Sequence, residues 1–169
     1  MASSEGAPAI HSAVAIDVTV EAGEWPGETV LYGLCEAAVE AAYAETAWTT
    51  PAGGSELSLL FTDDEHIRSL NAQWRGKDKA TNVLSFPAFE PVKGARLAPL
   101  LGDIVLAAET VAREAKAEEK LLEHHISHLV VHGLLHLIGH DHEVDAEADE
   151  MEALEKRVLA RLAIADPYA

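Results

Sequence analysis

Residues 132–142 read His-Gly-Leu-Leu-His-Leu-Ile-Gly-His-Asp-His. His132 and His136 are four residues apart, so on a helix they lie on the same face, one turn from each other. Gly139 follows three residues after His136, where a helix commonly ends in the left-handed conformation that glycine adopts at little cost. The chain can fold back after this glycine, and we expect it to bring His142 to the other two imidazoles.

Three histidines that converge on one point predict a metal centre. Three neutral imidazoles with an open fourth position are typical of a catalytic zinc site rather than a structural one. The spacing is that of the metzincin zinc proteases, but those enzymes carry a glutamate general base directly after the first histidine. Here that residue is Gly133. We therefore predict one Zn²⁺ per chain, held by His132, His136 and His142, and Gly133 disfavours peptide hydrolysis as its chemistry.

Seven of the nine histidines lie between positions 124 and 142, so some of them at helical spacing are expected by chance. His128 lies one turn before the first predicted ligand and is a candidate to orient it from behind. A packed or solvated side chain is the simpler interpretation for His128, as for His124 and His125. His140 and Asp141 lie in the predicted turn; either could be a fourth ligand, and Asp141 could instead orient a ligand.

Length and composition indicate one soluble globular domain over residues 1–169, in which 1–12 form a loose N-terminal extension. Hydrophobic residues make up 49% of the chain and charged residues 24%, as in ordinary globular proteins. The single cysteine, Cys35, excludes an intramolecular disulfide and suits a reducing compartment. The N-terminus does not resemble a signal peptide, and no stretch is long and apolar enough to span a membrane. We expect a cytoplasmic protein.

The net charge of −17 is unevenly distributed along the chain. Residues 1–67 hold twelve acids and no Lys or Arg, residues 68–120 hold nine bases against seven acids, and residues 121–169 hold three bases against ten acids. Since phosphate binding depends on Lys and Arg, only the middle segment could contact nucleic acid. Its densest part is Arg75-Gly-Lys77-Asp-Lys79. On charge alone, a solubilising polar loop is the simpler explanation for these three bases.

Hydrophobic periodicity predicts an α+β fold, with a small mixed β-sheet covered by helices and the metal helix near the C-terminus. Strands are expected over 13–20, 55–62, 83–86 and 102–107. Helices are expected from about Pro26 to 47, from Thr62 or Asp63 to 74, and over 108–118, 120–138 and 144–165. Residues 88–100 hold several prolines and are expected to be irregular.

The motif at 132–142 resembles the signature of the YbeY-type endoribonucleases, the bacterial rRNA maturation factors. Residues 71–87, Asn-Ala-Gln-Trp-Arg-Gly-Lys-Asp-Lys-Ala-Thr-Asn-Val-Leu-Ser-Phe-Pro, resemble the segment around that family's functional arginine. Leu101-Gly-Asp-Ile-Val resembles its glycine-aspartate-isoleucine strand, and Met151 and Glu155 match a weaker C-terminal pattern. The similarity spans roughly residues 55–162. Two residues depart from the pattern: Asn82 replaces the usual aspartate, and His140 a frequent tyrosine.

The resemblance implies metal-dependent cleavage of single-stranded RNA, in 3′-end maturation of 16S rRNA and in ribosome quality control. Its implied partners are small-subunit rRNA and ribosomes, with ribosomal or assembly proteins possible and no membrane. It also implies a catalytic role for Arg75, whose planar guanidinium suits the charge that develops on a phosphate in the transition state. Two alternatives remain open: a non-catalytic ribosome-assembly factor with a structural metal, and a zincin-type peptidase, which Gly133 disfavours.

Overall fold

The computed structural model describes residues 12–168. The elements, in chain order, are β2 (Val14–Val20), α1 (Glu28–Thr46), β3 (Ser55–Thr62), α2 (Asp64–Arg75), β4 (Val83–Pro87), β5 (Leu100–Ala107), α3 (Ala108–Ala117), α4 (Leu122–Leu137) and α5 (Asp145–Arg161). This confirms the predicted α+β class. None of the helices in residues 12–168 is long and apolar enough to cross a bilayer.

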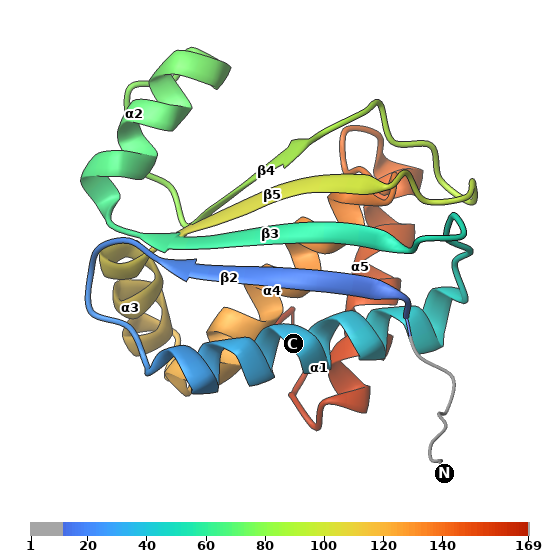
Figure 1. The fold of residues 1–169 in the computed structure, drawn as a ribbon. Helices are drawn as coiled ribbons and strands as arrows, with labels where there is room; N and C mark the ends of the chain where they lie inside the picture. Colours follow the sequence, from blue (N-terminus) through green and yellow to red (C-terminus); the bar gives the residue numbers. More distant parts are fainter. Residues whose placement is uncertain (1–11, 169) are drawn as a thin grey trace, which may run out of the picture.

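The four strands form one sheet in the order β2-β3-β5-β4. β2, β3 and β5 run parallel, whereas β4 pairs with β5 in the antiparallel direction. The sheet is therefore mixed, and β4 forms one of its edges. This position matters for the site because α4 packs next to this edge (Figure 1).

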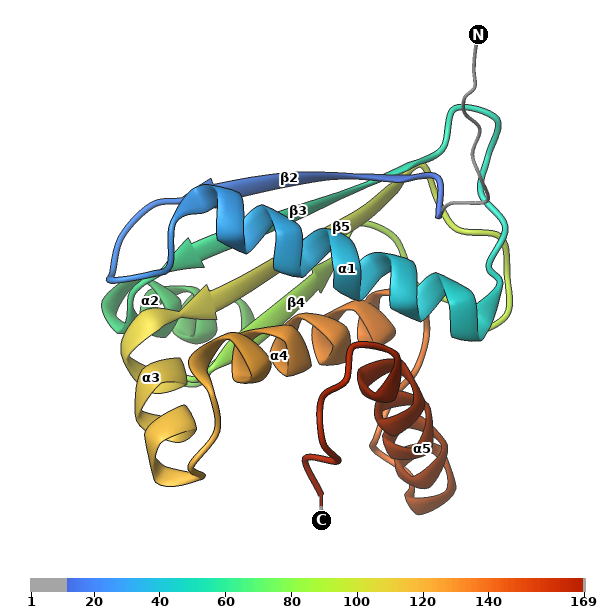
Figure 2. The same ribbon diagram turned by 90° about the horizontal axis from the view of Figure 1, so that it is seen from below.

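The helices α1, α3, α4 and α5 lie on one face of the sheet, and α2 lies on the opposite face near one end (Figures 1 and 2). In β3 the alternate residues Leu57, Leu59 and Phe61 are fully buried, because successive side chains of a strand point to opposite faces. They join the large core under α1 and α4. A second, smaller core around Ile67 and Val105 holds α2 against the sheet.

One stripe of α1 is buried in the large core. Leu31, Cys35, Ala38 and Ala42 are each 0% exposed, and their spacing places them on one helix face. Three of the four side chains are small, so the helix packs closely. Burial raises the pKa of the Cys35 thiol to about 12, which keeps it protonated inside the core.

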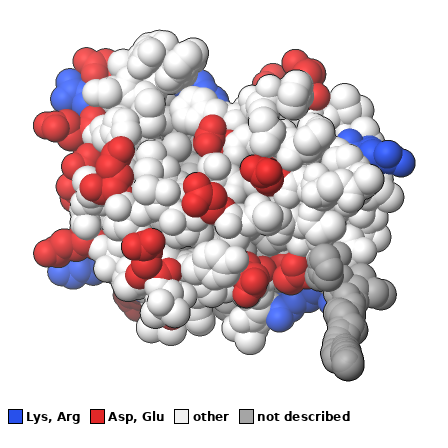
Figure 3. Space-filling view, viewed as in Figure 1, with Lys and Arg blue, Asp and Glu red and all other residues white. Residues whose placement is uncertain are grey.

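The face formed by α1 and β2 is acidic. Figure 3 shows acidic side chains over the middle of this face, with Lys and Arg mainly toward its margins. The sequence explains this, since every base lies after residue 67.

Some element boundaries differ from the prediction. α1 begins at Glu28 with Gly27 at its N-cap, so Pro26 precedes the helix instead of lying in its first turn. α5 ends at Arg161 rather than near 165. The expected loose extension falls mostly on residues 1–11, outside the described residues, whereas Ser12 is buried and its hydroxyl donates to Glu40 at 2.7 Å.

The end of α2 also differs from the prediction. Asp63 is the N-cap and its side chain accepts from the backbone N–H of His66. At the other end the helix continues through Arg75 and stops at Gly76, which has a φ of 69°. Arg75 is therefore the last residue of a helix rather than part of a loop, and its backbone is fixed.

Candidate functional site

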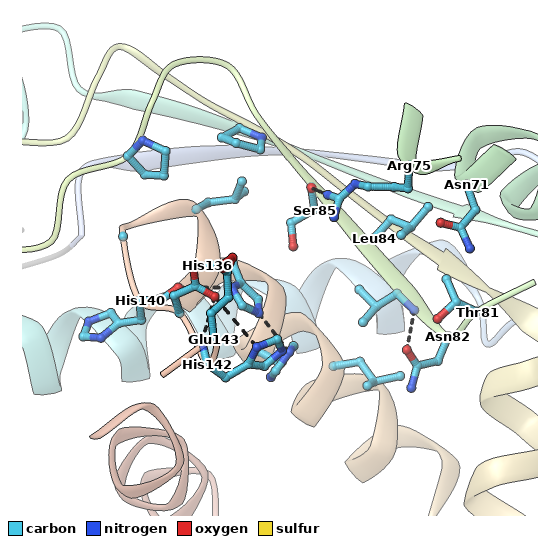
Figure 4. Close-up of a pocket in the computed structure, with 18 of the residues that line it drawn as sticks. Asn71, Arg75, Thr81, Asn82, Leu84, Ser85, His136, His140, His142 and Glu143 are labelled. Carbon is cyan, nitrogen blue, oxygen red and sulfur yellow. Dashed lines mark hydrogen bonds and ion pairs between the residues drawn. The ribbon is translucent and has the colours of Figure 1, made fainter. Parts of the chain in front are cut away.

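α4 presents His132 and His136 on one face, and the following turn returns His142 to them (Figure 4). The Nε2 atoms of His132 and His136 are 3.1 Å apart. One ring nitrogen from each of the three histidines lies within 4.8 Å of the others. Within residues 12–168, this is the group of His, Cys, Asp and Glu side chains placed to share a metal ion.

Gly139 produces the turn that returns His142. Its φ is +105°, a conformation that side chains rarely adopt, and a Cβ atom there would lie 2.4 Å from the backbone nitrogen of Lys93. The backbone of the irregular segment 88–99 therefore passes directly over this glycine. The sequence predicted the left-handed turn, but the close approach of Lys93 comes from tertiary packing.

Replacing Gly139 with alanine should lower both stability and zinc affinity. A non-glycine residue in a left-handed conformation costs roughly 1–2 kcal/mol, and the collision with Lys93 adds to this cost at Gly139. Gly76→Ala is the matched control, since Gly76 has a φ of +69° and no atom within 4 Å of its would-be Cβ. Urea unfolding of the metal-free variants should show the larger loss for Gly139→Ala. Equal losses would mean that the approach of Lys93 has no energetic effect.

Hydrogen bonds at Nδ1 orient two of the rings. His136 donates from Nδ1 to the carbonyl oxygen of His140 at 3.0 Å, and His132 donates from Nδ1 to Glu155 Oε1 at 2.8 Å. These bonds leave both Nε2 lone pairs facing each other across 3.1 Å. Two acceptors this close repel unless a cation lies between them, and two ligands of a tetrahedral zinc lie about 3.4 Å apart. The donor set therefore fits a zinc ion.

The environment of His136 favours its neutral form. Burial, followed by the neighbouring His132 and His142 rings, lowers the pKa of His136 to about 4. At neutral pH this imidazole is uncharged, which is the form that binds a metal.

Glu155 on α5 supports the histidines from behind. Its side chain is 1% exposed and accepts hydrogen bonds from His132, from His128 Nε2 at 3.0 Å and from the Tyr168 hydroxyl at 2.9 Å. Burial alone would raise its pKa, but the bonds from His128 and His132 outweigh burial and lower it to about 2. Glu155 is therefore an ionised, buried carboxylate that fixes the direction of His132.

The other residues that the sequence suggested near the metal group do not join it as ligands. His128 binds the same carboxylate as His132, so it belongs to the support behind the ligand. The imidazole of His140 points away from the three histidines (Figure 4), and its backbone carbonyl provides the contact to His136. The Asp141 carboxylate lies 3.8 Å from Nδ1 of His142, too far for a hydrogen bond. Neither residue joins the metal group.

The histidines line one side of an open cleft with a volume of about 840 Å³. The end of α2, the loop after it and β4 line the other side, with Asn71, Arg75, Lys77, Lys79, Thr81, Asn82 and Ser85. Figure 4 shows Arg75 and Ser85 across this space from His136 and His142. The structure thus brings the predicted metal residues and the predicted arginine into one cleft, on opposite walls.

Contacts with β4 hold the Arg75 side chain. Its Nη2 donates to the backbone carbonyl of Ser85, and the guanidinium lies over the Phe86 ring at 5.4 Å from the ring centre. A guanidinium has five N–H donors, so the bond to Ser85 leaves others for a ligand in the cleft.

Asn82, the departure from the family pattern, lies on the cleft wall and begins a polar chain that runs away from it. Its amide donates to both carboxylate oxygens of Glu114, at 3.0 and 3.3 Å, and its own oxygen accepts from the Val83 N–H. Glu114 also pairs with the buried His125 at 2.8 Å. An aspartate could not donate to Glu114 without a proton. His125 is therefore a packed, paired histidine, as the simpler interpretation held.

Reasoning from the sequence missed the roles of Glu155 and Tyr168. A signal for Glu155 was present, because it lies four residues after Met151 on the apolar stripe of α5, where an unpaired carboxylate is costly. Tyr168 carries no such signal, since its contact depends on the path of the chain after α5.

Comparisons with known proteins point to a single family. Residues 28–163 match the family model described as Endoribonuclease YbeY. The chain is 54% identical over 161 residues to "Endoribonuclease YbeY" of Rhizobium meliloti (strain 1021), covering 93% of this chain and 96% of that protein. It is 57% identical over 157 residues to the protein of the same name in Chelativorans sp. (strain BNC1), covering 93% and 94%.

A solved structure shows the same fold. The solution structure of a protein from Thermotoga maritima matches with a TM-score of 0.55 and 25% identity, over 88% of this chain and 91% of that one. With the family model covering most of the chain and close relatives of one name, the resemblance found in the sequence is confirmed: this chain belongs to the Endoribonuclease YbeY family.

Proposed function

We propose that the chain is a zinc-dependent endoribonuclease that cleaves single-stranded RNA. The observation that carries the proposal is that one cleft holds three converging histidines on one wall and a group of unpaired bases on the other. Such a cleft joins a metal to a phosphate-binding surface. The name of the relatives, endoribonuclease, indicates the substrate class.

The bases of the cleft stand out because most other bases are neutralised. Seven of the twelve Lys and Arg residues form ion pairs with carboxylates: Arg68, Lys93, Arg113, Lys120, Lys156, Arg157 and Arg161. Of the five without such a pair among the described residues, Arg75, Lys77 and Lys79 line the cleft. An acidic protein can therefore still offer a local positive surface to a phosphate backbone.

The residues of the cleft divide the chemistry between its two walls. His132, His136 and His142 would hold the zinc ion, which would supply an acidified water, with a pKa lowered from 15.7 toward about 7. Glu155 and the His140 carbonyl hold the His132 and His136 rings in the tautomers that leave Nε2 free. Arg75 binds the phosphate and stabilises the charge that builds on its oxygens in the transition state. Lys77 and Lys79 bind neighbouring phosphates.

The peptidase alternative finds no support in the structure. A Cβ at position 133 would lie 3.1 Å from Ile104 Cγ2, so a side chain there would face the sheet. The edge of β4 is also partly occupied: Arg75 binds the Ser85 carbonyl, the Asn82 side chain binds the Val83 N–H, and Pro87 has no N–H. These contacts leave fewer backbone groups for a peptide that would pair with this edge as an extra strand.

The cellular role proposed is 3′-end maturation of 16S rRNA and ribosome quality control, in the cytoplasm where ribosomes act. Ribosomal or assembly proteins would then be further partners. The competing proposal, a non-catalytic assembly factor with a structural metal, predicts RNA binding without cleavage. It also predicts that His136→Ala leaves the RNA-binding phenotype unchanged.

The decisive experiment combines elemental analysis with cleavage assays on purified protein. We expect one zinc per chain, cleavage of single-stranded RNA, little cleavage of a duplex of the same sequence and no cleavage of casein. Zinc-loaded protein that binds RNA and leaves it intact would favour the assembly factor, and cleavage of casein would favour the peptidase.

RNA affinity should depend only weakly on salt. With two to four phosphates bound by Arg75, Lys77 and Lys79, the slope of log affinity against log salt should be roughly −1.5 to −3, at about −0.7 per single-strand phosphate. Fluorescence anisotropy with a labelled oligonucleotide and cleavage-inactive protein measures this slope. A slope steeper than about −5 would require a basic surface larger than the cleft provides.

A further inference from the structure

The segment after α5 turns back toward the metal group. The helix ends at Arg161, and Ala163 adopts a positive φ of 59° while the Ile164 N–H donates to the Leu159 carbonyl. The chain then runs back between α3 and α5 in the view of Figure 2. Lys156 lies 3.6 Å from Asp166, and the Asp166 carboxylate accepts from the Tyr168 N–H at 2.8 Å. These contacts give the segment a defined path.

Tyr168 is the point at which this segment meets the site. Its hydroxyl donates to Glu155 Oε2 at 2.9 Å, and its ring stands edge-on to His128, with ring centres 6.0 Å apart. Tyr168 also lines the same cleft as His132 and Arg75. Tyr168 is thus part of the cleft wall and of the support behind it.

The two oxygens of Glu155 have different partners. Oε1 accepts from His132, whereas Oε2 accepts from both His128 and Tyr168. A buried carboxylate that loses one donor can rotate to share the remaining ones, which would bend the bond to His132. Burial and the nearby Glu155 charge raise the pKa of Tyr168, so its hydroxyl stays protonated and remains a donor. His128 depends on Glu155 as well: its Nε2 donates to this carboxylate, and its Nδ1 has no hydrogen-bond partner among residues 12–168.

We propose that Tyr168 is a positioning residue of the metal centre, which fixes the Glu155 carboxylate and through it the direction of His132. The segment after α5 then contributes to the metal centre through Tyr168, although Tyr168 lies outside residues 28–163, which match the family model. This inference rests on the proposed zinc site.

The test compares Tyr168→Phe, which removes only the hydroxyl, with Tyr32→Phe. Tyr32 on α1 is 43% exposed, close to the 44% of Tyr168, and lies away from the cleft. Zinc affinity is measured by competition with a chromophoric chelator. We expect a loss of roughly three- to tenfold for Tyr168→Phe, below the 10- to 100-fold typical of groups that contact a ligand directly. Glu155→Gln should lose more, and Tyr32→Phe nothing. In RNA cleavage, Tyr168→Phe should have a lower kcat and an unchanged KM.

A second measurement does not need zinc. Histidine-selective ¹⁵N NMR of the metal-free protein reports the Nδ1–H proton that His132 donates to Glu155, and Tyr168→Phe should shift it while Tyr32→Phe leaves it in place. An unshifted proton together with unchanged zinc affinity would overturn the inference. A second outcome would also overturn it: Tyr168→Phe keeps a normal kcat and KM, whereas Tyr168→Leu, which lacks the ring, has a raised KM. The ring would then contact RNA and would not position the metal centre. Wild-type protein that binds no zinc would refute the proposed function instead, and the NMR comparison would still decide the role of Tyr168.

Discussion

Arg75→Ala should lose most RNA cleavage while it keeps its zinc and its melting temperature. The guanidinium lies on the wall opposite the histidines and contacts neither them nor the main core, so its loss leaves both intact. Removing one preorganised donor to a transition-state charge costs on the order of 10²–10³ in rate, or about 3–4 kcal/mol. Zinc content, thermal melting and single-turnover cleavage on one preparation measure all three properties.

Two further variants sharpen this result. Arg68→Ala is the matched control, because Arg68 lies on the same helix but is paired with Asp78 at 2.8 Å; it should cleave normally. Arg75→Lys should recover little activity, since a point charge cannot copy the two-pronged contact of a guanidinium with phosphate. Near-normal cleavage by folded, zinc-loaded Arg75→Ala would remove Arg75 from the mechanism. A lowered melting temperature with proportionate activity would make it a purely structural residue, bound to β4.

Loss of any one histidine of the metal group should abolish stable zinc binding. In His136→Ala two imidazoles remain, and we expect zinc well below one per chain after dialysis. Cleavage should fall with it, by on the order of 10³-fold or more, because the metal supplies several kcal/mol of transition-state stabilisation. The same result is expected for His132→Ala and His142→Ala.

His124→Ala provides the comparison for this series. His124 is on the same helix, two turns before His132, and does not belong to the metal group. It should keep full zinc occupancy and full activity. Full occupancy in His142→Ala would contradict a three-histidine site, and would direct attention to a different third ligand.

The parts of the site that the sequence predicted are those encoded by local spacing. His132 and His136 share a helix face by periodicity alone, and Gly139 marks the turn because few other residues adopt its conformation. The returning position of His142 follows from these two facts. Arg75 was proposed from its motif, and the sequence placed it in the loop after a helix ending at 74. The helix in fact continues through Arg75 and stops at Gly76.

The parts that could not be predicted depend on packing between distant elements. Glu155 meets His132 only because α5 packs against α4, and Tyr168 meets Glu155 only because the chain folds back after α5. The start of α1 was also predicted imprecisely, because Pro26 was placed in its first turn. A proline favours the start of a helix, but the helix begins two residues later at Glu28.

The single buried thiol on α1 can serve as a chemical probe of how often the native state opens. Cys35 is fully buried and its pKa is about 12, so alkylating reagents, which attack the thiolate, cannot label it while α1 stays in place. In the unfolded chain the thiol returns to an ordinary pKa of about 8.5 and reacts. The rate of labelling therefore reports how often the core opens. A bound ligand should slow this rate by the factor by which it stabilises the fold, so one cysteine can report occupancy of a cleft that it does not touch.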